Sequence, residues 1–356
     1  MTAALQTTSP ARARFSPLAI FRKPEGGALA GVILIFLFFA YFGWDRNFLS
    51  ALGTSGWLNF ASTVGIIALP IGFLMIAGEL DISIGAMVPA GKMVLAITVG
   101  FYEMNVWVGV LLTLLFAASI GFINGWIVTR TKVPSLIVTL ATLFSVAGLS
   151  LFLSLYLTDT TQLGLQDAQG DAISEFVFGT YFNLAIGDFT IWQGLQSSVF
   201  IWFAFAAACY YFLHVSPWGN WVFALGGDQE SARNAGIPIN KLKIALFMLS
   251  AMAASTVGIT ETFLSNSAST TTQFTMIFNC IIAVVVGGVL LTGGFGTVTG
   301  IFCGTLTLGI VQQGINYTSF DRNLSSLIIG VMLLIAVLTN DTFRNMATNW
   351  SAAKKS

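Results

Sequence analysis

Long apolar runs separated by short polar segments dominate the pattern along the chain. A helix needs about 20 mostly apolar residues to cross a bilayer, and ten runs reach or approach that length. The first run is short, and the third and eighth are interrupted by Gly and polar residues, so these two could be broken or partly re-entrant. The pattern predicts an all-α polytopic membrane protein. The ten expected spans are 28–43, 58–77, 82–101, 106–128, 134–157, 195–214, 242–264, 275–291, 296–315 and 324–340.

Composition supports a membrane protein. Of 356 residues, 56% are hydrophobic and 8% are charged, whereas soluble domains carry about 25% charged residues. The net charge is zero, which gives no reason to expect a nucleic-acid partner. The three cysteines lie far apart in apolar runs and predict neither a disulfide framework nor a metal site. We find no cluster of His, Cys and carboxylates and no activated nucleophile, so no catalytic residue is assigned and a membrane enzyme is the least favoured class.

Basic residues orient the spans, because positive charges near a span stay in the cytoplasm. With the N-terminus inside, twelve Lys and Arg fall on the inner side and only Arg46 and Arg322 on the outer side. We therefore expect a cytoplasmic tail at 1–27, one transmembrane domain at 28–340 and a cytoplasmic tail at 341–356. The inner set is Arg12, Arg14, Arg22, Lys23, Arg130, Lys132, Arg233, Lys241, Lys243, Arg344, Lys354 and Lys355.

The long segment Thr158–Gly194 falls on the outer, periplasmic side in this topology. It holds five acidic residues, among them Asp167, and no Lys or Arg. Two interpretations stay open: a solvated loop, or a docking surface for a soluble partner.

Two carboxylates, Glu79 and Asp81, lie with Ser83 between the second and third expected spans. A charge that faces lipid is expensive, so these groups must face a cavity, the interface or a cation. Flanking glycines are typical of a broken helix whose backbone lines a cavity. The segment could be a cytoplasmic turn in which Asp81 or Ser83 caps the next helix, part of the translocation pathway, or both.

Lys92 is the only basic residue deep inside an expected span. It could pair with Glu79 or Asp81, contact the substrate, or extend to an interface. We expect Glu79 and Lys92 to face one aqueous cavity and to be electrostatically coupled. Asn124 also lies in a span, where interhelical hydrogen bonding is the usual role of an amide, and we include it among the pathway candidates.

The glycine-rich run Gly287–Gly294 resembles the run Gly78–Gly85, with Gly at the first and eighth positions and a hydroxyl residue at the sixth. Corresponding interrupted spans in two halves of a transporter indicate its pathway. Downstream, Gly296, Gly300 and Gly304 recur every four residues and predict a face for close helix packing.

The loop Gly226–Lys243 is the most specific feature. Asp228 can cap a short helix that continues to Ala235, with Glu230 in its first turn. Gly236 should end that helix, and Pro238 prevents its continuation. A short polar helix on the cytoplasmic side is suited to docking on a cytoplasmic protein. The docking residues expected here are Asp228, Glu230, Arg233, Gly236 and Ile237.

These motifs together resemble the permease subunits of bacterial ATP-binding-cassette importers for ribose, xylose and arabinose, over about Asn59 to Thr342. The resemblance rests on four runs: 78–85, Gly121–Gly125, Gly226–Ile237 and 287–296. Two residues depart from the family pattern, Glu79 at a usual glycine and Lys92 at a usually small or apolar position. They leave the substrate open among sugars, polyols and inositol.

The resemblance implies a multi-pass permease in the bacterial inner membrane, paired with a second permease subunit. It also implies cytoplasmic ATPase subunits, which would bind ATP and Mg in place of this chain, and a periplasmic sugar-binding protein. Two alternatives stay open: a branched-chain amino-acid permease of the same architecture, and an ion-coupled secondary transporter that uses Glu79 and Asp81 as ion sites. The second alternative does not explain the short polar helix.

Overall fold

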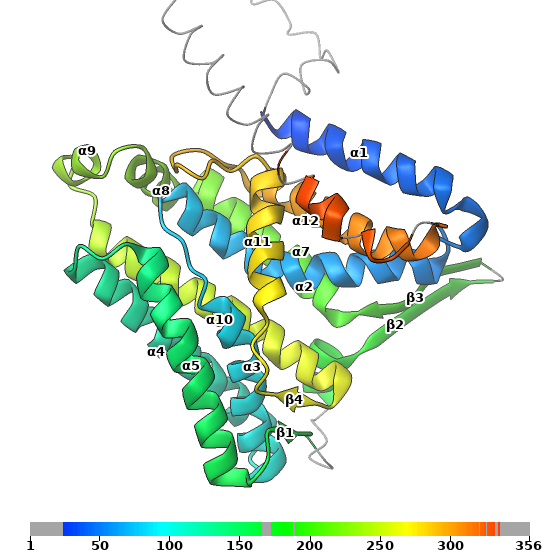
Figure 1. The fold of residues 1–356 in the computed structure, drawn as a ribbon, viewed down its shortest axis with the longest axis horizontal. Coiled ribbons are helices and arrows are strands. Elements are labelled where there is room, and N and C mark those ends of the chain that lie inside the picture. Colours follow the sequence, from blue (N-terminus) through cyan, green and yellow to red (C-terminus); the bar gives the residue numbers. More distant parts are fainter. Residues whose placement is uncertain are drawn as a thin grey trace, which may run out of the picture.

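The fold is a bundle of long helices, seen here in a computed structural model that describes residues 24–165, 172–187, 189–319, 321–324, 326–331 and 334 (Figure 1). Apolar helices and short polar connections alternate, as expected from the hydropathy pattern. The principal helices are α1 (Pro24–Phe42), α2 (Ala51–Ile76), α3 (Ile84–Leu95), α4 (Val106–Arg130), α5 (Ser135–Thr158), α7 (Ser197–Tyr210), α8 (Pro217–Gly227), α9 (Gln229–Asn234), α10 (Ile239–Ser265), α11 (Phe274–Val286) and α12 (Val298–Gly314).

Seven helices in the described part are long and apolar enough to cross a membrane. Two of these are extended by a π-helical turn: α3 by η3 (Ala96–Phe101) and α7 by η5 (Tyr211–Val215). Another, α12, continues into the 3₁₀ turn η6 (Ile315–Tyr317). Two further apolar helices are shorter, Gly26–Phe42 and Phe274–Val286. The prediction of a polytopic helical membrane protein is confirmed.

The interrupted spans differ from each other. The third expected span is one continuous helical segment, Ile84–Phe101, although it contains Pro89. The eighth ends early, since α11 stops at Val286 and an irregular connection leads to α12. Most of the tenth span and both predicted tails, except residues 24–27, lie outside the described residues.

Helix α2 forms the centre of the bundle, with 83% of its most apolar window buried. It packs against α7, α10, α11 and α12, and every residue from Val64 to Ile76 is buried, although Leu52 near its start is exposed. By contrast, only 22% of the corresponding window of α5 is buried. Its Phe144, Phe152 and Tyr156 are exposed, as expected for side chains that meet lipid.

The two ends of the bundle are built differently (Figure 1). At the start of α2, the Asn59 amide donates to Gly194 O (2.9 Å) and accepts from Gln196 N (2.9 Å), which fixes the hairpin β2 (Tyr181–Ile186) and β3 (Phe189–Gln196) there. At the far end of α2, Ile76 O accepts from Gly294 N (2.8 Å), next to α8. We call these the hairpin end and the α9 end.

The charges follow this division. The last turn of α4 packs on the first turns of α10, where Gly125 lies against Ile244, so Arg130 and Lys132 share the α9 end with Arg233, Lys241 and Lys243. Arg46 lies at the opposite end, where its guanidinium donates to Thr318 O (2.9 Å). Among the described residues, the fold therefore separates Arg46 from these five basic residues, as the charge rule did, while the side of the membrane that each end faces stays a prediction.

Two small antiparallel sheets lie at or near the hairpin end, and hydropathy did not predict them. The strands β1 (Gln162–Leu163) and β4 (Ala268–Ser269) tie the segment after α5 to the segment after α10. In the hairpin, Tyr181 pairs with Gln196 and Ile186 with Phe189, around Gly187 at φ +62°. Short helices α6 (Ala172–Ser174) and η4 (Glu175–Gly179) precede it, whereas Asp167, Asp171 and Asp188 lie outside the described residues.

Candidate functional site

The short polar helix α9 forms as expected from its cap residues. Asp228 Oδ1 accepts from Ser231 N (2.5 Å), which satisfies one of the free amides of the first turn. At the other end, Gly236 takes φ +82°, and its N–H donates to Arg233 O (2.9 Å) while Ile237 N donates to Ala232 O (3.2 Å). These paired bonds are the Schellman stop that glycine permits.

The exposure of α9 divides its residues into two sets. Ala232 is buried, and Ile237 packs against the core. Asp228, Glu230, Arg233 and Gly236 are exposed. Hydrogen bonds from Ser231, through its side chain and its backbone, lower the pKa of the Asp228 carboxyl, so the cap is ionised at neutral pH. The helix is thus anchored on one face and presents charged side chains on the other.

The connector between α2 and α3, residues Ala77–Ser83, begins with the same kind of helix stop. Gly78 has φ +81°, and Glu79 N donates to Leu74 O (2.8 Å). Asp81 Oδ1 then accepts from Ser83 N (2.9 Å) and Ser83 Oγ (2.6 Å). Ser83 itself makes no capping bond to α3, so Asp81, through Ser83, shapes the entry to that helix.

Side chains of α4 and α5 hold the connector. Ser135 Oγ accepts from Leu80 N (3.1 Å), and Thr139 Oγ1 accepts from Ile82 N (3.3 Å). Further along, the Asn124 amide donates to Ser83 Oγ (3.2 Å), and Asn124 Oδ1 accepts from Thr142 Oγ1 (2.5 Å). Three of the expected pathway residues, Asp81, Ser83 and Asn124, therefore form one buried network.

Two oxygen atoms at this network take no part in the hydrogen bonds described above. Among the described residues, Asp81 Oδ2 and Ser250 Oγ are buried without a hydrogen bond of normal geometry, and the two groups lie close enough to interact with each other. Buried polar atoms are normally satisfied, and exceptions need an explanation. We interpret them as atoms available to a polar ligand or to water.

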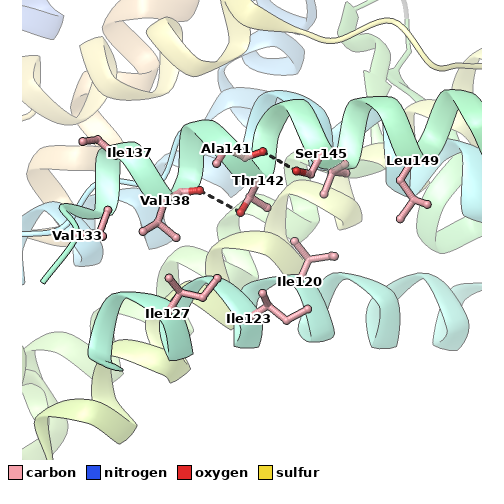
Figure 2. A pocket seen from close by; sticks show the side chains of 11 residues that line it. Ile120, Ile123, Ile127, Val133, Ile137, Val138, Ala141, Thr142, Ser145 and Leu149 are labelled. Carbon is pink, nitrogen blue, oxygen red and sulfur yellow. Dashed lines mark hydrogen bonds between the residues drawn. The ribbon is translucent and has the colours of Figure 1, made fainter. Parts of the chain in front are cut away.

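A groove of about 450 Å³ lies between α4 and α5 (Figure 2). The hydroxyls of Thr142 and Ser145 lie on its wall: Ser145 donates to its own helix at Ala141 O (2.8 Å), and Thr142, which donates to Asn124 Oδ1, also lies 3.1 Å from Val138 O. Branched aliphatic side chains supply nearly all of the remaining wall. The groove does not suit a polyhydroxylated ligand, because such a ligand would lose its hydrogen bonds there.

Glu79 faces α10 and α9. It forms an ion pair with Lys243 in the first turns of α10. The same ammonium donates to Gln229 Oε1 (2.9 Å), the first residue of α9. Both charged side chains are largely buried, so the pair satisfies two groups that would be costly alone.

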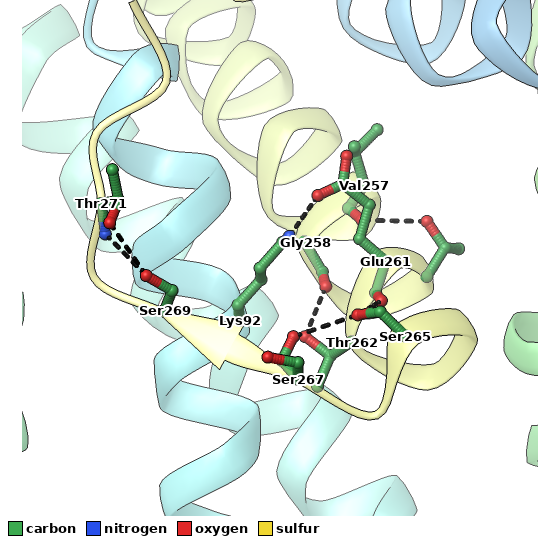
Figure 3. Close-up of polar contacts among 10 residues, drawn as sticks. Lys92, Val257, Gly258, Glu261, Thr262, Ser265, Ser267, Ser269 and Thr271 are labelled. Carbon is green, nitrogen blue, oxygen red and sulfur yellow. Dashed lines mark hydrogen bonds and ion pairs between the residues drawn. The ribbon is translucent and has the colours of Figure 1, made fainter. Parts of the chain in front are cut away.

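The expected pairing of Lys92 with Glu79 or Asp81 is wrong in this structure. Lys92 pairs with Glu261 near the other end of α10 (Figure 3). The reason is the position of the two groups: Glu79 lies in the connector before α3, whereas Lys92 is eight residues, about 12 Å, along α3 from its first residue Ile84. The segment after α10, with Ser267, Ser269 and Thr271, runs past this pair.

The second glycine-rich connector, between α11 and α12, has the same kind of helix stop as the first. The match is shifted by one residue from the one that the sequence predicts. After α11, the left-handed stop residue is Gly288 at φ +85°, with Val289 N donating to Val284 O (3.2 Å), so Gly288 rather than Gly287 corresponds to Gly78. The two connectors also touch: a Cβ on Gly293 would come within 3.2 Å of the Gly78 backbone. This contact places both helix interruptions at one junction.

Of the predicted glycine face, Gly300 and Gly304 lie on α12 against α11. A Cβ on Gly300 would overlap Gly287 O, and one on Gly304 would overlap Ala283 O, which lets α11 and α12 pack backbone to backbone. Gly296 precedes α12 and lies against Ile76 and Val289. No group of three or more potential metal ligands occurs in the described residues.

Sequence reasoning missed the residues that connect these parts. Lys243 was counted only as a charge at the inner side, and Gln229 was given no role. Ser135, Thr139 and Glu261 were also unassigned as partners. A lysine one turn into a span was an available signal for Lys243, whereas no signal in the sequence identified which helix it faces.

Comparisons with known proteins agree with this architecture. The family model described as "branched-chain amino acid transport system / permease component" matches residues 53–337. The L-arabinose transport system permease protein AraH of Escherichia coli (strain K12) is 29% identical over 310 residues, which cover 86% of this chain and 89% of that protein. No solved structure matches.

Two further relatives extend the comparison. The L-arabinose ABC transporter permease protein AraH of Azospirillum brasilense is 30% identical over 346 residues, covering 95% of this chain and 93% of the relative. The ribose import permease protein RbsC of Escherichia coli (strain K12) is 28% identical over 295 residues, 83% of this chain and 87% of the relative. The chain therefore belongs to the family of branched-chain amino acid transport system permease components, as a multi-pass membrane subunit of a bacterial ABC importer, not itself an enzyme.

Proposed function

We propose that this chain is the permease of an importer for a monosaccharide or related polyol. The observation that carries the proposal is the similarity, over most of both chains, to permeases named for L-arabinose and ribose. The polar network around Asp81, Ser83 and Asn124 supports it, because hydroxyl and carboxylate groups pair well with a ligand rich in hydroxyls.

In this proposal α9 docks on a cytoplasmic ATPase subunit, which binds ATP and Mg. The exposed residues Asp228, Glu230 and Arg233 meet the ATPase, while Gly236 and Ile237 hold the helix against the bundle. A rigid helix with capped ends transmits displacement better than a flexible loop, since its ends cannot unwind freely.

The remaining partners follow from the class of importer. A second permease subunit completes the translocation pathway. A sugar-binding protein docks at the hairpin end, on the periplasmic side. The pathway runs beside the junction of the two connectors and past Asp81, Ser83 and Asn124. Lys92, paired with Glu261, lies nearer to the hairpin end.

A branched-chain amino acid remains a second candidate substrate, because the family model is described by that substrate. The buried ion pairs do not separate the two, since an amino acid also carries groups that bind carboxylates and ammonium groups. The relatives named above favour the sugar.

Uptake measurements test the substrate. In the source bacterium, deletion of this gene should abolish uptake of at least one of radiolabelled L-arabinose, D-ribose and D-fructose, and a plasmid copy should restore it. Copurification of an ATPase with the tagged chain is expected as well. Loss of L-leucine uptake, with all three sugars unaffected, would overturn the sugar proposal.

A further inference from the structure

The ion pair between Glu79 and Lys243 joins three separate elements of the α9 end. Glu79 belongs to the connector Ala77–Ser83, Lys243 to α10 and Gln229 to α9. Lys243 Nζ bonds to both Glu79 Oε1 and Gln229 Oε1. The Lys243 side chain is 8% exposed, so the ammonium depends on these partners in place of water.

On one side, this bridge is attached to a short helix whose two ends are fixed by hydrogen bonds. Gln229 is the first residue of α9, directly after the Asp228 cap. The cap and the Gly236 stop keep the six-residue helix intact, so any displacement of α9 displaces Gln229 with it. The ammonium of Lys243 must then follow or lose a hydrogen bond while buried.

On the other side, the bridge is attached to the polar network. Two residues after Glu79, Asp81 accepts from both the N–H and the hydroxyl of Ser83. Ser83 in turn accepts from Asn124 on α4. A shift of Glu79 therefore acts on the backbone that holds Asp81 and on the start of α3.

We propose that Glu79, Lys243 and Gln229 are positioning residues that transmit displacement of α9 to the connector Ala77–Ser83. This inference rests on the proposed function, because it requires α9 to be the helix that docks on the ATPase. It goes further by identifying the route from that helix into the pathway. None of the three residues binds the ATPase or the sugar in this scheme.

The test measures sugar uptake per ATP hydrolysed, with the complete importer in proteoliposomes and L-arabinose, D-ribose and D-fructose as probes. Lys243→Met should lower uptake per ATP about tenfold, within the 5–150-fold range of coupling between two sites, while the ATPase still copurifies. Lys241→Met is the matched control, because it removes an exposed lysine of the same helix turn. It should behave as wild type. Lys243→Arg should retain coupling, since a guanidinium can also donate to both partners.

If Lys243→Met does not insert into the membrane, Gln229→Ala still tests the proposal. It removes one hydrogen bond from an exposed residue and leaves the ion pair in place, so the protein should fold and uptake per ATP should fall about threefold, below that same range. Unchanged uptake per ATP in Gln229→Ala, or in a folded Lys243→Met, overturns the bridge alone. Failure of the wild-type chain to copurify with an ATPase, or transport of L-leucine but of none of the three sugars, would instead overturn the proposed function.

Discussion

Helix α10 forms two ion pairs, one with Glu79 in the connector before α3 and one with Lys92 in α3. The surroundings of the two pairs differ. Lys243 and Glu79 lie at the α9 end, and their side chains are 8% and 11% exposed. Glu261 and Lys92 lie about 27 Å further along the helix at 1.5 Å per residue, and their side chains are 26% and 14% exposed. The α9-end pair has Gln229 as a third partner, whereas the second pair joins only α3 and α10.

This difference indicates different roles for the two pairs: the α9-end pair holds elements together, whereas the Lys92–Glu261 pair is more accessible to water or ligand. A buried ion pair with a third hydrogen-bonding partner constrains the three elements that carry these residues. If one element moved, the polar groups of the other two would be left buried without a partner. A more exposed pair can exchange its partner for water or for a polar ligand at lower cost. We therefore expect the α9-end pair to govern coupling and stability, and the Lys92–Glu261 pair to tolerate change.

The largest expected effect tests whether the two ends face opposite sides of the membrane. A cysteine at Asn234, on α9, should react with an impermeant thiol reagent only after the cells are opened. A cysteine at Thr190, exposed on the hairpin, should react in intact cells. The unmodified chain is the control for its native cysteines, of which Cys209 and Cys280 are buried. Labelling of position 234 but not 190 from outside would invert the topology and remove the docking role of α9.

Removal of one partner of the α9-end pair should come next. Glu79→Leu leaves a buried ammonium without its counter-charge, which typically costs about 3–5 kcal/mol. Thermal unfolding in detergent should show a much lower midpoint. The double variant Glu79→Leu with Lys243→Met should recover most of that loss, because no unpaired charge remains. Equal loss in the single and double variants would show that the ion pair contributes little beyond packing.

The Lys92–Glu261 pair should be less sensitive. Lys92→Met should cost between the roughly 0–1 kcal/mol of exposed pairs and the roughly 3–5 kcal/mol of broken buried pairs. The same unfolding assay measures it, with Glu261→Gln as the complementary change. A loss as large as that of Glu79→Leu would contradict the comparison.

The smallest effect is expected at the α9 cap. Asp228→Ala removes the bond to Ser231 N, so the amides of the first turn should exchange with deuterium faster, while the rest of the bundle keeps its protection. Asp228→Asn, which retains an acceptor, is the matched control. Because the folded pKa of Asp228 is lowered from 3.8, the capping contribution is complete at neutral pH and is lost as pH falls through that lowered value. Faster exchange across α10 as well would show that α9 is not a local unit.

Much of the fold could be predicted from the sequence, because both lipid and helix periodicity act locally. The limits of α4, α5, α7 and α12 agree with hydropathy within a few residues, and the cap and stop of α9 follow from Asp228 and Gly236. The β2–β3 hairpin could not be found in this way, since averaging over 20 residues conceals the short alternation of a strand.

The site could be predicted only in part. Asp81, Ser83 and Asn124 were identified as polar residues that need partners, and they do meet. Their mutual contact, and the choice of Lys243 for Glu79, depend on how α4, α5 and α10 pack against the connector. Packing partners of a helix are set by shape at close-contact positions such as Gly121 and Gly125, and one sequence does not specify them.

The glycine contacts at the α9 end have a practical consequence for anyone who wants to tag this protein. A side chain at Gly226 would overlap Ile76 O, and one at Gly293 would press on Gly226 O, so an inserted epitope there should disrupt the junction. At the tip of the hairpin, a side chain on Gly187 would meet no neighbouring atom within 4 Å, although its φ of +62° favours glycine. Exposed loop tips accept insertions best. The hairpin tip therefore has room for a reporter in stability and labelling assays, but not in uptake assays, because the proposed binding protein docks at the same end.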